Sequence, residues 1–123
     1  MNSKDFIGKW ESVNTSEEMG FDTYSYIERT EDFLLKCLIV DIFHEDKSVS
    51  KSNVNGTWKY SKSIYTEIYP DENLQYCIHK FENNIINMTF KDDISEYYDN
   101  SFNENKVKEF SHFSIPVGYQ LTK

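Results

Sequence analysis

The sequence contains no alanine and only one arginine, Arg29, among its 123 residues. Alanine is the strongest helix former, so its absence disfavours a helical bundle. The chain has nine tyrosines and nine phenylalanines and many isoleucines, valines and threonines, all of which favour β-strands. The composition therefore predicts an all-β protein. The excess of lysine over arginine, with frequent Asn, Ile, Tyr and Phe, is typical of an AT-rich bacterial genome.

Long apolar runs are also missing. No stretch approaches the roughly 20 apolar residues that a membrane-spanning helix needs. The first apolar cluster, Phe6 and Ile7, follows no basic region that would indicate a secretory signal. The length fits one hydrophobic core. We therefore expect a cytoplasmic protein whose residues 1–123 form a single β-barrel domain.

The residue patterns of common catalytic and metal sites are absent. Cys37 and Cys77 each lie in an apolar, strand-like run, which predicts free buried thiols, and no CxxC or Cys/His spacing indicates zinc. The three histidines are far apart, without HxH or HExxH, and neither GxSxG nor a glycine-rich phosphate loop occurs. We predict a protein that is not an enzyme, with no catalytic residues, metal or cofactor.

Turn-forming residues recur every 8 to 12 positions, which is typical of an antiparallel sandwich or barrel. A helical turn capped by Ser3 should precede Gly8, and loops or turns are expected at 14–20, 44–47, 53–56, 70–73 and 83–84. The apolar run 33–43 predicts a strand buried on both faces. The full set of eight to ten predicted strands comprises 8–13, 24–30, 33–43, 48–52, 57–60, 63–69, 74–82, 85–90, 107–114 and 117–122.

Residues 91–106 interrupt this regular pattern. Asp93 followed by Glu96 fits a capping box, so a single helical turn is one possibility, and a long acidic, aromatic loop is the other. Tyr97 and Tyr98 lie among these carboxylates. The segment is the least strand-like part of the second half of the chain.

The stretch Phe6-Ile7-Gly8-Lys9-Trp10 matches an FxGxW pattern at the start of the first strand. Followed by a run of antiparallel strands, it resembles the lipocalin-like and fatty-acid-binding-protein-like barrels of the calycin group. The resemblance implies an up-and-down barrel in which Trp10 plugs the closed end and Gly8 allows the tight turn beneath it. A second motif, Gly56-Thr57-Trp58, resembles the central hairpin of small bacterial lipocalin-like domains, in which a strand ends at Asn-Gly.

Three departures from these families concern function. Lipocalins place an arginine from near the C-terminus over the plug tryptophan, and here Lys108 or Lys123 would have to replace it. Fatty-acid-binding proteins hold the ligand carboxylate with an Arg-x-Tyr on the last strands, whereas this chain offers only Tyr119. Their helical lid has no room in the loop at 14–20. The resemblance therefore implies the fold more strongly than fatty-acid binding.

The charge pattern predicts a protein partner. The formal net charge is -8, which disfavours nucleic acids and anionic membranes as partners and favours a basic protein. The acidic, aromatic segment combines contact area with carboxylates that can pair Lys or Arg. We predict partner-binding residues in this segment and in the acidic turn before residue 48: Asp92, Asp93, Glu96, Tyr97, Tyr98, Asp99, Glu45 and Asp46.

These features favour a bacterial immunity protein that neutralises a cationic secreted toxin. The toxin would be a nuclease, most plausibly an RNase domain, and the acidic surface would cover its basic active site in a 1:1 complex with a monomer. Small size, acidity, absence of catalytic motifs and the AT-rich residue choice fit this interpretation. Its composition is similar to that of immunity proteins of contact-dependent growth inhibition systems.

The alternative is a lipocalin-like carrier that binds a small apolar ligand inside the barrel. Aromatic residues make up 16% of the chain and could line a cavity, or their side chains could fill it. A cavity of a few hundred cubic ångströms is the requirement for this function.

Overall fold

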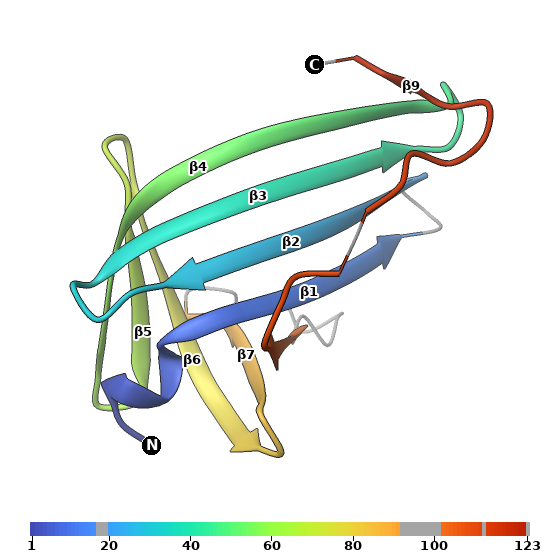
Figure 1. Ribbon diagram of the computed structural model, residues 1–123. Helices are drawn as coiled ribbons and strands as arrows, with labels where there is room; N and C mark the ends of the chain where they lie inside the picture. Colours follow the sequence, from blue (N-terminus) through green and yellow to red (C-terminus); the bar gives the residue numbers. More distant parts are fainter. Residues whose placement is uncertain (17–19, 92–101, 112, 123) are drawn as a thin grey trace.

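The computed structural model describes residues 1–16, 20–91, 102–111 and 113–122. One short 3-10 helix, η1 (Ser3–Phe6), precedes the strands, and its N-cap is Asn2 rather than the expected Ser3. The strands, shown in Figure 1, are β1 (Gly8–Ser16), β2 (Phe21–Arg29), β3 (Leu34–Phe43), β4 (Ser48–Ser61), β5 (Ile64–Ile68), β6 (Asn73–Glu82), β7 (Ile85–Phe90), β8 (Phe102–Val107) and β9 (Gln120–Leu121).

Eight of these strands close into an antiparallel up-and-down barrel. Their order around the barrel is β1-β2-β3-β4-β5-β6-β7-β8, and β8 returns to β1. The pairing of β1 with β8 is short, joining Lys9, Trp10 and Glu11 to residues 107, 106 and 105. The predicted all-β barrel with a short N-terminal helical turn is confirmed, and its architecture is consistent with the calycin resemblance.

Strand β4 pairs with two different strands along its length, β3 and β5. Its first part pairs with β3 along the whole of that strand, and its last five residues, from Thr57, pair with β5. In Figure 1, β1 to β4 lie side by side as long strands, while β5 to β7 cross them steeply. The predicted turn at 53–56, and the hairpin implied there, are therefore wrong. The chain continues as one strand and bends instead of reversing.

The bend depends on Gly56, which lies directly before the residue shared by both pairings. A Cβ atom at this position would clash with the carbonyl oxygen of Ile68 and lie 2.8 Å from Cδ1 of Tyr69. The β5 end can therefore approach β4 closely only because residue 56 has no side chain. The Asn55-Gly56 pair that resembles a hairpin turn serves instead as a place of close backbone contact.

The inner core occupies the barrel end next to η1. Phe6, Trp10, Trp58 and Tyr65 are all almost completely buried there. The Trp10 indole donates a hydrogen bond of 2.8 Å from Nε1 to the carbonyl oxygen of Phe6, which joins η1 to the barrel wall. The rings of Phe6 and Tyr65 stack with centroids 5.0 Å apart. This end of the barrel is therefore filled with aromatic side chains.

A second, smaller core lies outside the barrel. Val40, Ile42 and Val49 are buried on the outer face of β3 and β4, against Phe113 and Tyr119 of the C-terminal segment. Figure 1 shows this segment passing over β1 and β2 to reach β9 beside β4. The expectation that the strand at 33–43 has both faces buried is therefore correct for its second half.

The C-terminal segment differs from the prediction. Of the described residues in the predicted strand 107–114, only Val107 belongs to a strand, and the strand predicted at 117–122 is reduced to β9, which pairs in parallel with Ser48 and Val49. The predicted loop at 14–20 is also too long, because β1 continues to Ser16. The polar residues at 14–16 led to the prediction of a loop, although a strand with one exposed face accepts polar residues.

Candidate functional site

The barrel interior holds a cavity of about 600 Å³ beyond the aromatic core. Its wall combines apolar and aromatic side chains with small hydroxyl groups, and its rim includes the exposed residues Asn14, Asp71 and Glu72. The cavity therefore reaches the molecular surface. Its inner lining residues include Ser12, Thr23, Ser25, Ile27, Cys37, Ile39, Glu67, Tyr69, Leu74, Tyr76, Phe90, Phe102 and Glu104.

The alternation of side chains along two strands explains why this end is hollow. On β1 the inward side chains change from Trp10 to Ser12, and on β2 from Arg29 and Ile27 to Ser25. Large side chains thus fill the η1 end, whereas serine leaves space at the other end. The hollow is encoded by side-chain size at inward positions that lie two residues apart.

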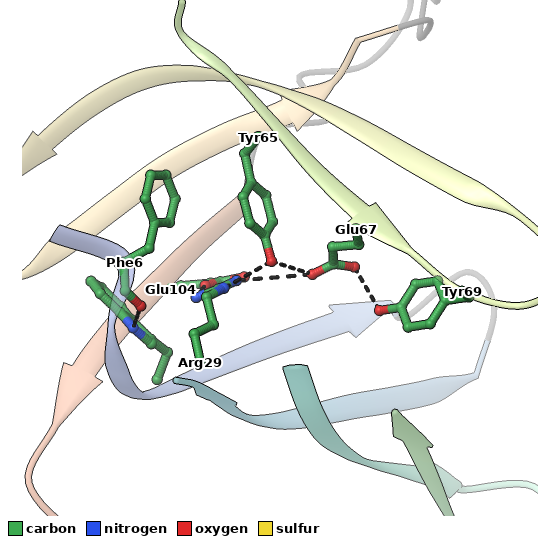
Figure 2. Close-up of polar contacts among 7 residues, drawn as sticks. Phe6, Arg29, Tyr65, Glu67, Tyr69 and Glu104 are labelled. Carbon is green, nitrogen blue, oxygen red and sulfur yellow. Dashed lines mark hydrogen bonds and ion pairs between the residues drawn. The ribbon is translucent and has the colours of Figure 1, made fainter. Parts of the chain in front are cut away.

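A buried polar network lies between the aromatic core and the cavity (Figure 2). Arg29 contacts Glu104 at 2.7 Å between Nη1 and Oε1, and its Nε donates to the Tyr65 hydroxyl at 2.8 Å. Tyr65 and Tyr69 each donate a hydroxyl hydrogen bond of 2.8 Å to Glu67, one to each carboxylate oxygen. Arg29 Nη2 lies 3.9 Å from Glu67 Oε2, so one guanidinium faces two carboxylates.

Burial and the neighbouring charges together set the proton affinities in this network. Burial alone would lower the pKa of Arg29, but Glu104, Tyr65 and Glu67 outweigh it and keep the guanidinium charged. Burial raises the pKa of Glu67 above its ordinary value, although Arg29 opposes this shift. The pKa of Tyr69 is also raised, first by burial and then by Glu67. Tyr69 therefore remains a hydroxyl donor to Glu67 at neutral pH.

The two cysteines are free thiols, as the sequence predicts, but they are half-buried rather than buried. Cys37 lines the cavity, and burial raises its pKa to about 12. Its thiolate is therefore scarce at neutral pH, which gives this side chain the character of a small apolar wall residue rather than a nucleophile.

The lining of the cavity is acidic. Among the described residues that line it, none is lysine or arginine, whereas Glu67, Asp71, Glu72 and Glu104 carry carboxyl groups. Across the described ranges, no group of three or more His, Cys, Asp or Glu side chains is placed to hold a metal ion. The space around these carboxyl groups, about 600 Å³, has the volume of a small-molecule pocket.

Of the predicted partner-binding residues, the two that the structure describes, Glu45 and Asp46, do not line this cavity. Glu45 and Asp46 are exposed in the turn between β3 and β4. The predicted residues Asp92, Asp93, Glu96, Tyr97, Tyr98 and Asp99 lie outside the described residues.

The structure places Gly8 and Trp10 at the η1 end, and cations cover the tryptophan. The Arg29 guanidinium lies 5.9 Å from the Trp10 ring centroid, and the Lys106 ammonium nitrogen lies 5.6 Å from it. Lys108, one expected substitute for the lipocalin arginine, is exposed, and Lys123 lies outside the described residues. The cations that contact Trp10 thus come from β2 and β8.

Tyr119 does not reach the barrel interior. Its hydroxyl lies 2.8 Å from Nδ1 of His44, whose Nε2 lies 2.9 Å from a carboxylate oxygen of Asp22. These contacts hold the C-terminal segment to the outside of the barrel. Tyr119 therefore does not take the place of the carboxylate-binding tyrosine of fatty-acid-binding proteins.

Sequence reasoning missed Arg29, Glu67 and Glu104 as site residues. One signal was available for Glu67, because it alternates with Tyr65 and Tyr69 and so shares the inward face of β5 and the residues that follow. The single arginine beside apolar Ile27 was a second signal. Nothing in the pattern around Glu104 distinguishes it from an exposed acidic residue.

Comparisons of the chain with protein-family models, curated proteins and solved structures found no match. Among the residues that the structure describes, no helix has the length and apolar character needed to cross a lipid bilayer.

Proposed function

We propose that this protein binds a small, mainly apolar molecule inside its barrel. The observation that carries the proposal is the cavity of about 600 Å³ between the polar network and the rim. Known ligand pockets range from about 300 to 1,000 Å³ and combine apolar walls with a few polar groups. The alternative interpretation of the sequence, a lipocalin-like carrier, meets the size requirement set for it.

The chemistry of the wall supports a binding role. Ile27, Ile39, Leu74 and the ring of Tyr76 can cover an apolar body, while Glu67 and Tyr69 supply fixed polar groups at the inner end. These polar groups are held by hydrogen bonds before any ligand arrives, so little ordering is needed on binding. The arrangement favours recognition of a shaped molecule over nonspecific uptake.

The test is binding of an environment-sensitive apolar dye, such as 1-N-phenylnaphthylamine, followed by fluorescence titration. We expect saturable binding with a micromolar dissociation constant. The variant Ser25→Phe places a large ring in the wall and should weaken binding at least tenfold. Ser61→Phe makes the same change at an exposed position of β4 and should leave binding unchanged. Absence of saturable binding, or equal binding by Ser25→Phe, would contradict the proposal.

We propose an immunity protein for a basic toxin as the second candidate. It is favoured by the acidic cavity rim, where Asp71 and Glu72 are exposed, and by the exposed pair Glu45 and Asp46. Such surfaces speed encounter with a cationic protein, and the effect falls with salt. A nuclease whose active site binds phosphates is the kind of toxin that this charge suits.

This candidate is tested by co-expression with the product of the neighbouring upstream gene in the native strain. Recovery of a stoichiometric basic protein that is toxic alone would support it. Charge reversal at Asp92, Asp93 and Glu96 should then lower the affinity for the toxin and make binding less sensitive to salt. Reversal at Glu45 and Asp46 should have the same effects. Reversal of the exposed Glu109 serves as the control. If no basic protein is recovered, the immunity interpretation loses its support.

A further inference from the structure

We infer that the ligand of the cavity is a cation, namely an organic ammonium ion with an apolar body. The inference rests on the proposed binding function and names the class of ligand for the same cavity. It depends on three features: the excess of negative charge in the cavity, the unused acceptor capacity of Glu67, and the aromatic rings in the wall.

The first feature is an excess of negative charge. Glu67 and Glu104 lie at the inner end of the cavity and Asp71 and Glu72 at its rim, with no lysine or arginine among the described lining residues. Arg29 lies behind them and faces both glutamates. When both glutamates are ionised, one guanidinium cannot neutralise two carboxylates. A ligand cation would supply the missing positive charge, whereas a carboxylate ligand would add repulsion.

The second feature is that Glu67 retains unused acceptor capacity. Each of its oxygens accepts one tyrosine hydroxyl, at 2.8 Å from Tyr65 and Tyr69, and an ionised carboxylate has about four acceptor positions. Arg29 Nη2 is 3.9 Å away, beyond hydrogen-bond distance. An ammonium group entering from the cavity can therefore bind Glu67 without displacing a partner.

The third feature is the set of aromatic rings in the cavity wall. Tyr76 lies 4.8 Å from Phe90 and 5.7 Å from Phe102, measured between ring centroids. All three side chains line the cavity. Aromatic faces attract cations and also cover apolar chains, so the same wall suits both parts of an alkylammonium or arylalkylammonium ion.

Proton linkage provides an independent readout. Burial raises the pKa of Glu67, so a bound cation would favour the ionised form and release a proton on binding. The other titratable groups around Glu67 are Arg29 on β2, Cys37 on β3, Tyr65 and Tyr69 from β5 and its end, Tyr76 on β6 and Glu104 on β8. Arg29, Cys37 and the three tyrosines have pKa values raised away from neutrality, so none of these five groups changes its charge when Glu67 ionises.

The experiment compares three ligands with the same ten-carbon chain: decylammonium, decanol and decanoate. Each ligand is added to the dye-loaded wild-type protein at concentrations below the critical micelle concentration of that ligand, and displacement of the dye is measured. We expect decylammonium to bind at least tenfold more tightly than decanol, and decanoate to bind most weakly. The preference for decylammonium over decanol should grow between pH 5 and pH 7. Equal or tighter binding of decanol or decanoate overturns the inference.

Two variants locate the effect. Glu67→Gln keeps one acceptor oxygen for a tyrosine hydroxyl, replaces the other oxygen by an amide donor and removes the charge. The preference for decylammonium should therefore fall to threefold or less while decanol binding persists. Glu109→Gln, at an exposed glutamate, should keep the preference. If Glu67→Gln fails to fold, the rim variant Asp71→Asn with Glu72→Gln replaces it and should also reduce the preference. An unchanged preference in the charge-removing variant overturns the inference.

Failure of the inference can be told apart from failure of the proposed function. If decanol binds in the cavity, as judged by its loss in Ser25→Phe, but decylammonium has no advantage, the protein binds ligands without selecting cations. If none of the three ligands displaces the dye and the dye itself does not saturate, the binding function fails and the inference fails with it.

Discussion

At the scale of single residues, Arg29 both pairs with a carboxyl group and lies over an aromatic ring. Its guanidinium contacts Glu104 at 2.7 Å and also lies 4.7 Å from the Tyr65 ring centroid. The side chain is completely buried, and its positive charge compensates the carboxyl groups of Glu104 and Glu67 beside it. Removing one partner of such a network leaves uncompensated charge in the interior.

We therefore predict that Arg29→Met lowers the free energy of unfolding by about 3–5 kcal/mol. The matched control is Lys9→Met, which removes a surface ion pair of 3.5 Å with the exposed Glu109. That change should cost less than about 1 kcal/mol because water screens the pair. Urea denaturation of both variants provides the measurement, and equal losses would contradict the prediction.

A prediction for pH follows from Glu67. Its pKa is raised by burial in the folded protein, so the folded state binds this proton more readily than the unfolded chain does. The resulting stabilisation is complete below the unfolded pKa of about 4.3 and is lost as pH rises through the folded pKa. Relative to Glu67→Gln, the wild-type protein should therefore become less stable with rising pH.

Denaturation of wild type and Glu67→Gln at pH values from 4 to 8 provides the measurement. The difference between their unfolding free energies isolates Glu67, because the remaining groups are common to both proteins. The difference should move in favour of Glu67→Gln as pH increases. Parallel curves would show that burial does not perturb this carboxyl group.

The buried network also shows where prediction from the sequence ends. Period-two alternation places Tyr65, Glu67 and Tyr69 on one face, but it does not state whether that face is buried or exposed. Glu67 and Glu104 come from β5 and β8, which are distant in sequence, and meet Arg29 only after the barrel closes. The all-β class was predictable from composition and turn spacing and the barrel from the FxGxW resemblance, whereas this meeting of side chains depends on strand register.

At the scale of elements, β4 defines the shape of the barrel by pairing with β3 and then with β5. The sequence around its bend, Asn55-Gly56, is a typical turn signal, and the prediction of a turn was wrong for that reason. Glycine is needed at the bend because the backbone of Ile68 approaches it. One residue type serves both tight turns and close backbone contacts, and local sequence does not distinguish them.

Gly56→Ala tests this account of the bend. The added Cβ atom would meet the Ile68 carbonyl and the Tyr69 ring, so strands β4 and β5 must move apart. We expect a loss of about 1–3 kcal/mol, as for other overpacked sites. The neighbouring Thr57→Ala, at an exposed side chain, should change stability by less than about 0.5 kcal/mol. Thermal or urea denaturation compares the two, and similar effects would contradict the close-contact role.

At the scale of the whole molecule, the barrel has cores on both sides of its wall. The inner core fills the η1 end, and the outer core of Val40, Ile42 and Val49 is covered by Phe113 and Tyr119. The outer core was not predictable, because local patterns show that a strand has two apolar faces without showing which segment covers the second one. The cover consists of chain with little regular structure.

Removing this cover should expose an apolar patch. The double variant Phe113→Ser with Tyr119→Ser is expected to lose about 1–3 kcal/mol of stability and to self-associate at high concentration. Val117→Ser, at a fully exposed side chain, provides the control. Static light scattering measures the association, and dye binding in the cavity should remain intact because the change is outside the barrel. A double variant that stays monomeric would contradict the covering role.

The short pairing of β1 with β8 has a consequence for the order of events in time. It joins residues 9–11 to residues 105–107, so almost the entire chain must be in place before these strands meet. Closing so long a loop is entropically costly, and we expect it late in folding. The cavity is complete only after this step. A ligand would therefore leave the folding rate unchanged and lengthen the lifetime of the folded state.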